Sequence, residues 1–87
     1  MMPAKKQIIE QMARATDQLA EIRRLELSDP SESAAASEAY ALSELFVPVV
    51  QANLSMENAL ELTGAIMTCI QRCIDRRKAE LARHATS

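Results

Sequence analysis

The stretch IIEQMARATDQLAEI, residues 8–22, decides the fold class of this chain. Its apolar residues recur at spacings of four, three, four and three, which is the pattern of a helix that packs along one side. The members of this seam are Ile8, Met12, Ala15, Leu19 and Ile22. We expect the helix to cover about 3–27, because Pro3 suits a first helical turn. The seam can pack within the chain or form an intermolecular coiled coil. Three heptads are too few to distinguish these two arrangements.

The composition also favours an all-α fold. One Gly and three Pro leave few positions for β-turns, and good helix formers dominate. The chain has one Tyr, one Phe and no Trp, and Ala supplies much of its 48% hydrophobic content. A core this thin often gains further burial from another chain. We therefore expect one domain over 1–87, a helical hairpin or three-helix bundle that oligomerisation completes.

A break follows the first helix at Ser28-Asp29-Pro30. Proline disfavours a helical conformation at the residue before it. Asp29 then resembles an N-cap, with Pro30 at the first helical position and Glu32 three residues after the cap. This predicts a second helix over about 30–47, antiparallel to the first.

Pro48 predicts a kink or a short break between about 47 and 54, because proline removes one helical hydrogen bond. Ser55 resembles the N-cap of a third helix, and three helices are our first interpretation. The heptad phase nevertheless continues from Val49 to Ile74, with Asn53 as its one polar member. This continuity leaves a bent second helix as the alternative.

The last helix is expected over about 55–83. Its apolar arc between 59 and 74 is too wide for one neighbouring helix, which predicts a central position in the bundle. Gly64 costs about 1 kcal/mol relative to Ala in a helix. We expect another helix to cross closely at this glycine.

The charges divide the chain into three parts. No Lys or Arg occurs between Arg24 and Arg72. Seven acidic residues lie in this interval: Glu26, Asp29, Glu32, Glu38, Glu44, Glu57 and Glu61. On antiparallel helices this pattern sets an acidic second helix beside a basic first helix. It favours matching of helices within or between chains over recognition of a small ligand.

Candidate chemistry is sparse. Cys69 and Cys73 lie on one helical face and could form a thiol switch or half of a metal site, but a tetrahedral zinc site needs four ligands. We interpret both as small core residues, with a thiol or metal sensor as an alternative. In the sequence, no Cys, Ser or carboxylate stands at a recognisable triad spacing from the single His84, which we interpret as a surface residue near a helix end. We expect no catalytic residue, no metal and no cofactor.

A basic cluster lies near the C-terminal end of the chain. It consists of Arg72, Arg76, Arg77, Lys78 and Arg83. Such a cluster could contact nucleic acid through phosphates. No aromatic residue accompanies it for stacking, and the sequence pI is about 5.3. We therefore prefer to interpret the cluster as a solvated helix end or as an internal partner of the acidic interval. A transcriptional regulator that binds nucleic acid through this helix is the alternative.

The helical layout is superficially similar to that of the small chorismate mutases, which are interlocked three-helix dimers. That resemblance would imply Arg and Lys side chains in the middle of the chain to hold a dicarboxylate. Residues 25–71 contain neither. With no phosphate loop or nucleophile motif either, we expect that the chain is not an enzyme.

The sequence predicts a small helical protein–protein interaction module, such as an adaptor, co-chaperone or anti-activator, that binds through apolar helix faces. The Ser28-Asp29-Pro30 turn resembles that of the helical co-chaperones and needle-type subunits of type III secretion, over three residues. The partner is a protein or a second copy in a homodimer. The expected packing and interface residues are Leu19, Ile22, Leu42, Phe46, Leu60, Met67 and Ile70. No apolar run long enough for a membrane span and no signal peptide is present, so we expect a cytoplasmic location.

Overall fold

The computed structural model describes residues 3–31 and 33–86, and this part of the chain contains helices and no strand. The helices are α1 (Pro3–Ser28), α2 (Ala34–Ser43), α3 (Phe46–Gln51) and α4 (Met56–Thr86). The prediction of an all-α fold is confirmed for the described residues. Completion of the bundle by oligomerisation stays a prediction.

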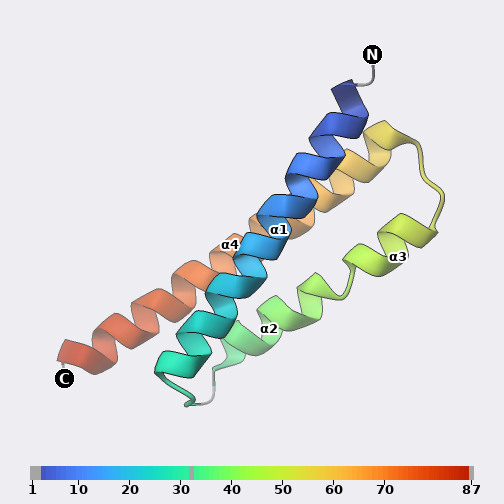
Figure 1. Ribbon diagram of the computed structural model, residues 1–87. Helices are drawn as coiled ribbons and strands as arrows, with labels where there is room; N and C mark the ends of the chain where they lie inside the picture. Colours follow the sequence, from blue (N-terminus) through green and yellow to red (C-terminus); the bar gives the residue numbers. More distant parts are fainter. Residues whose placement is uncertain (1–2, 32, 87) are drawn as a thin grey trace.

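Helices α1 and α4 lie side by side and run in the same direction, and α2 and α3 run back in the opposite direction on one side of this pair (Figure 1). The parallel register is visible where Gln11 bonds to Thr63, Gln18 Nε2 donates to the carbonyl oxygen of Met67 at 3.1 Å, and Glu21 pairs with Lys78. The antiparallel register of α2 is visible where Ser33 bonds to Glu80 and Glu38 bonds to Arg76. Helix α4 contacts all three other helices, which confirms its predicted central position.

The start of the second helix was predicted wrongly. Helix α2 begins at Ala34, and its N-cap is Ser33, whose hydroxyl accepts from the Ala36 N–H at 3.2 Å. Asp29 instead accepts from the Ser31 N–H at 3.1 Å, so its carboxylate closes a local turn between α1 and α2. The expected capping-box residue Glu32 lies outside the described residues. The hydroxyl of Ser33 therefore has the capping role that we expected for Asp29.

Pro48 lies inside a helix, so the kink or break predicted between about 47 and 54 does not occur at the proline itself. Helix α2 ends at Ser43, and α3 begins two residues later at Phe46. Pro48 is thus in the first turn of α3, where a missing N–H has no intrahelical acceptor to satisfy. The helical chain is interrupted around Glu44, between α2 and α3. Glu44 lies four residues before Pro48, and its carbonyl oxygen cannot accept a hydrogen bond from proline, which has no N–H.

The chain reverses at Asn53, within the predicted interval of about 47–54, so the bent-helix alternative is wrong. Asn53 has a φ of 55° in the left-handed region, which Asn tolerates at helix C-termini. Ser55 then caps α4, as predicted: its hydroxyl accepts from the Asn58 N–H at 3.2 Å. Helix α4 extends to Thr86, three residues beyond the expected end.

The core lies between the C-terminal half of α1, α2 and the middle of α4. Its best buried large side chains are Ile70 and Ile74, with Ile22 and Leu25 of α1 packed on them. Ala39 of α2 is 1% exposed, and its small side chain allows α2 to approach closely. The N-terminal half of α1 lies outside this core.

The predicted close crossing at Gly64 is not present. A Cβ atom at this glycine would meet Gln11 Nε2 at 3.6 Å, which is ordinary van der Waals contact. The glycine is therefore not required by a neighbouring helix.

Candidate functional site

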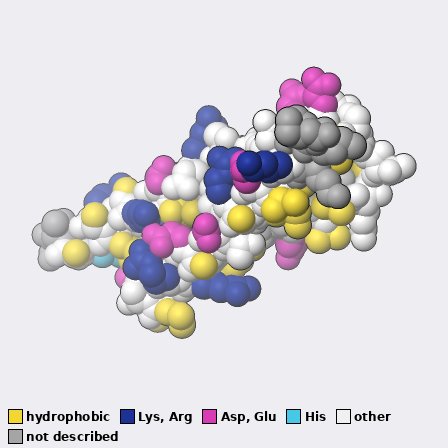
Figure 2. All heavy atoms as spheres, turned by 45° about the horizontal axis from the view of Figure 1, so that its top comes forward, with side chains coloured by type: hydrophobic (Ala, Val, Ile, Leu, Met, Phe, Trp, Pro, Cys, Tyr) yellow, Lys and Arg dark blue, Asp and Glu magenta, His cyan; other side chains and the backbone are white. Residues whose placement is uncertain are grey.

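An apolar groove of about 520 Å³ lies between α1, α3 and the start of α4. Ile8, Met12 and Leu19 form one wall, and Phe46, Val49 and Val50 form the other. We call it the α1–α3 groove. Figure 2 shows apolar side chains gathered at the end of the molecule where α1 begins. None of the described residues that line the groove is charged.

The groove exists because α3 stands away from α1 (Figure 1). Helix α2 packs on the core through small side chains, whereas α3 contacts α4 and has no fully buried residue. The floor of the groove is formed by the small residues Ala15 and Ala59 and by Thr63. The Thr63 hydroxyl bonds to Gln11 Oε1 of α1 and to the carbonyl oxygen of Ala59 at 2.8 Å. The Thr63–Gln11 bond holds α1 to α4 without filling the space between α1 and α3.

Large apolar side chains of α1 and α3 are exposed to solvent, and two of them, Met12 and Val50, line the groove. On α1, Met12 is 59% exposed and Ile9 is 60% exposed. On α3, Val50 is 72% exposed and Val47 is 58% exposed. Single exposed apolar residues are common on protein surfaces, but a contiguous group beside an apolar groove is typical of an interaction surface.

The predicted interface residues fall into two groups. Ile22, Met67 and Ile70 are buried within the chain, at 3%, 8% and 0% exposure. The other four are partly buried. Leu19, Leu42 and Phe46 pack against the core cluster, and Leu60 is not among the residues packed against it. Leu19 and Phe46 also line the α1–α3 groove. The structure thus brings two of the seven to the candidate site.

Sequence reasoning missed three exposed apolar residues of α1 and α3. Ile9, Val47 and Val50 lie outside the heptad seams, so they were not considered as interface positions. A signal was present, because the segment 45–56 contains no charged residue and α3 has apolar side chains on all sides. A helix that is apolar around its circumference is ordinarily covered.

The basic cluster is largely used inside the fold. Arg77 is 2% exposed and donates to the carbonyl oxygens of Asp29 at 2.9 Å and Ser31 at 3.2 Å. Arg76 pairs with Glu38, a member of the acidic interval. These contacts agree with the internal role that we preferred for the cluster.

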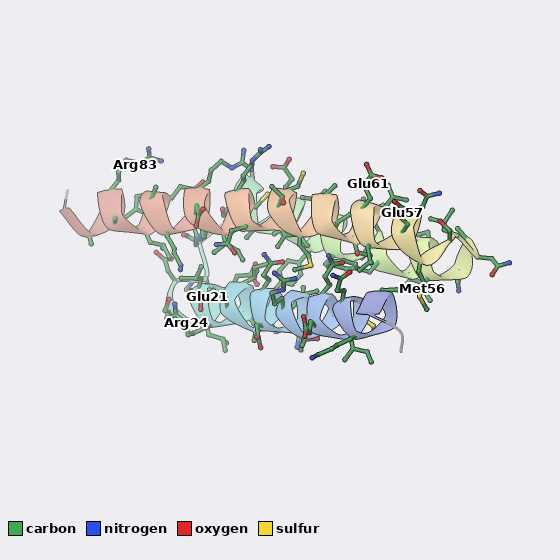
Figure 3. The ribbon with its side chains drawn as sticks, turned by 90° about the horizontal axis from the view of Figure 1, so that it is seen from above. Glu21, Arg24, Met56, Glu57, Glu61 and Arg83 are labelled. Atoms are coloured by element: carbon green, nitrogen blue, oxygen red, sulfur yellow. The ribbon has the colours of Figure 1, made fainter. Side chains whose placement is uncertain are left out.

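Glu21 of α1 joins two cations. Arg24 donates to both of its carboxylate oxygens, at 2.7 and 2.9 Å, and Lys78 Nζ lies 3.1 Å from Oε1 (Figure 3). The Arg24 hydrogen bonds, followed by that of Lys78, hold the pKa of Glu21 at about 2, below its usual 4.5. The Lys78 contact fastens α1 to α4 beside the buried core.

The two cysteines differ in their surroundings. Cys73 is 4% exposed and belongs to the core cluster, whereas Cys69 is partly exposed. Burial, and then the charge of Glu38, raises the pKa of the Cys73 thiol. A raised pKa leaves little thiolate at neutral pH, which lowers reactivity. Among the described residues, no group of three or more His, Cys, Asp or Glu side chains could hold a metal ion.

Comparison with protein-family models, curated proteins and solved structures finds no match for the chain. In the described part of the chain, no helix has an apolar stretch long enough to cross a bilayer. The α1–α3 groove is therefore interpreted from its own geometry.

Proposed function

We propose that the chain is a non-catalytic protein–protein interaction module, of the adaptor, co-chaperone or regulator kind, and that the α1–α3 groove is its binding surface. The observation that carries this proposal is the exposure of Met12 and Val50, 59% and 72%, on opposite lips of an apolar groove. Covering such side chains removes apolar surface from water, which favours association. A helix is the element that most often fills a groove between helices.

The alternative functions have less support. A nucleic-acid surface needs cations that are free to meet phosphates, but Arg77 is buried and Arg76 and Lys78 pair with acids of this chain. A thiol sensor needs a reactive thiolate, but Cys73 lies in the core. We therefore favour protein binding.

A photo-reactive amino acid at position 50 tests the proposal in the native host. Irradiation should attach a protein to the Val50 position, and mass spectrometry identifies it. The matched control places the same amino acid at Ala65, an exposed residue of α4. Figure 3 shows Glu57 and Glu61 pointing away from α1, and Ala65 continues this spacing of four. Absence of any protein adduct at position 50, or equal adducts at both positions, would contradict the proposal.

A further inference from the structure

The surface of the single chain is larger than its mass requires. Its accessible area is 6133 Å², about 1,000 Å² more than a compact 9.6 kDa monomer exposes. The Cα radius of gyration is 14.8 Å, against about 12 Å for a compact domain of this length. A protomer loses about 800 Å² in a standard interface. The surplus is therefore comparable to the area that one protomer loses in a standard interface.

The charge pattern favours a second copy as the partner. In a twofold interface the same surface patch of each copy meets the other, so a groove that carried charge of one sign would meet like charge. The described lining of the α1–α3 groove has no charge, and neither has the segment 45–56. A groove built for an acidic or basic partner would carry the opposite charge on its lips.

The two lips of the groove are also suited to each other. Met12 on α1 is a long, flexible side chain that adapts to irregular surfaces. Val50 on α3 is a compact side chain that protrudes at 72% exposure. In a twofold dimer, the α3 lip of one copy meets the α1 lip of the other, and the same contact occurs twice.

From these observations we infer that the α1–α3 groove is filled by the same groove of a second copy, with Val50 of each protomer packed against Met12 of the other. The inference rests on the proposed function, since it names the partner of the same surface. It makes the chain a homodimer whose apolar α3 is covered.

A charge-swap mixing experiment tests this pairing. Sedimentation equilibrium at about 100 µM, roughly a hundredfold above a micromolar dissociation constant, should give a dimer for the wild type. Val50→Glu and Met12→Lys should each be monomeric, because each buries two unpaired charges. An equimolar mixture should form a heterodimer, which has one native Met12–Val50 contact and one Lys–Glu pair. Both positions are more than half exposed in the single chain, so the variants should keep wild-type circular dichroism.

The control Ala65→Glu adds the same charge outside the groove and should leave the dimer intact. A monomeric wild type, or single variants that dimerise like the wild type, would overturn the inference. A dimeric wild type whose variants stay monomeric on mixing would overturn the Met12–Val50 pairing. If the wild type is monomeric but position 50 captures a different protein in the host, the homodimer inference fails and the proposed function stands. If position 50 captures no protein at all, both the inference and the proposed function fail.

Discussion

Arg77 of α4 donates through Nη2 to the backbone carbonyl oxygen of Asp29 at 2.9 Å, across 48 positions of sequence. The same nitrogen bonds to the carbonyl oxygen of Ser31 at 3.2 Å, and Nη1 lies 3.1 Å from Glu80 Oε2. A buried guanidinium thus fastens the turn between α1 and α2 onto the central helix. The planar fork of Arg suits this multiple contact better than the single ammonium of Lys.

Replacement of Arg77 should destabilise the fold more than replacement of the neighbouring Arg76. Arg77→Met loses the hydrogen bonds to Asp29 and Ser31, and we expect a loss of about 2 kcal/mol in unfolding free energy. Arg77→Lys should fall between this variant and the wild type. Arg76→Met removes an ion pair whose side chains are more than half exposed, so it should change stability little. Urea unfolding measures all three, and equal losses at 76 and 77 would contradict the role of Arg77.

Gly64→Ala should stabilise the protein. The structure leaves 3.6 Å between the added Cβ and Gln11 Nε2, and Ala is a better helix former than Gly by about 1 kcal/mol. We expect a gain of about 0.5–1 kcal/mol in unfolding free energy. Thermal and urea unfolding check this. A loss of stability would show that a helix crosses more closely at position 64 than the structure has it.

Glu21 should make stability depend on acid pH. Its pKa of about 2 in the fold lies below the usual 4.5, so the ionised carboxylate stabilises the folded state above about pH 4.5. This contribution is lost as the pH falls from about 4.5 toward 2. The stability difference between wild type and Glu21→Gln should therefore be largest near neutral pH and vanish toward pH 2. High salt should reduce the difference, because the ion pairs are exposed to screening.

A difference between the variants that is unchanged from neutral pH to pH 2 would contradict the Arg24 and Lys78 contacts of Glu21. Urea midpoints at several pH values provide this measurement.

The sequence predicted the kind of structure and the approximate places of its reversals, but not the exact helix boundaries. Helical periodicity and composition give helices, and the Ser55 cap is a local signal, so these predictions succeed. The start of α2 was missed because Asp29 and Ser33 both suit an N-cap, and only the tertiary contact of Ser33 with Glu80 distinguishes them. The chain reverses at Asn53, inside the interval of about 47–54 where Pro48 predicted a kink or break, but the proline itself lies within α3.

The candidate site was predictable only in part. Leu19 and Phe46 were found because seam residues also line the groove. Val50 was not, since its exposure depends on how far α3 stands from α1, which no local pattern encodes. Burial of Arg77 was missed for a related reason: a basic helix end looks solvated until a turn from elsewhere in the chain covers it.

The two cysteines should react with thiol reagents at different rates. Cys69 is partly exposed, whereas Cys73 is buried and the pKa of its thiol is raised. In native protein we expect fast modification of one thiol, and modification of Cys73 only on unfolding. Mass-resolved alkylation with and without urea identifies the residues, and Cys69→Ser serves as the control. Fast native modification of Cys73 would restore the thiol-sensor alternative.

Oxidation of Met12 tests most directly whether protein covers the α1–α3 groove. In the single chain Met12 is 59% exposed and Met67 is 8% exposed, so the two thioethers provide an exposed and a buried probe. Hydroxyl-radical footprinting of purified wild type at about 100 µM should oxidise Met12 as slowly as Met67, and Val50→Glu should make Met12 react fast. Fast oxidation of Met12 in the wild type, at the rate found in Val50→Glu, would show an uncovered groove and contradict self-association through it.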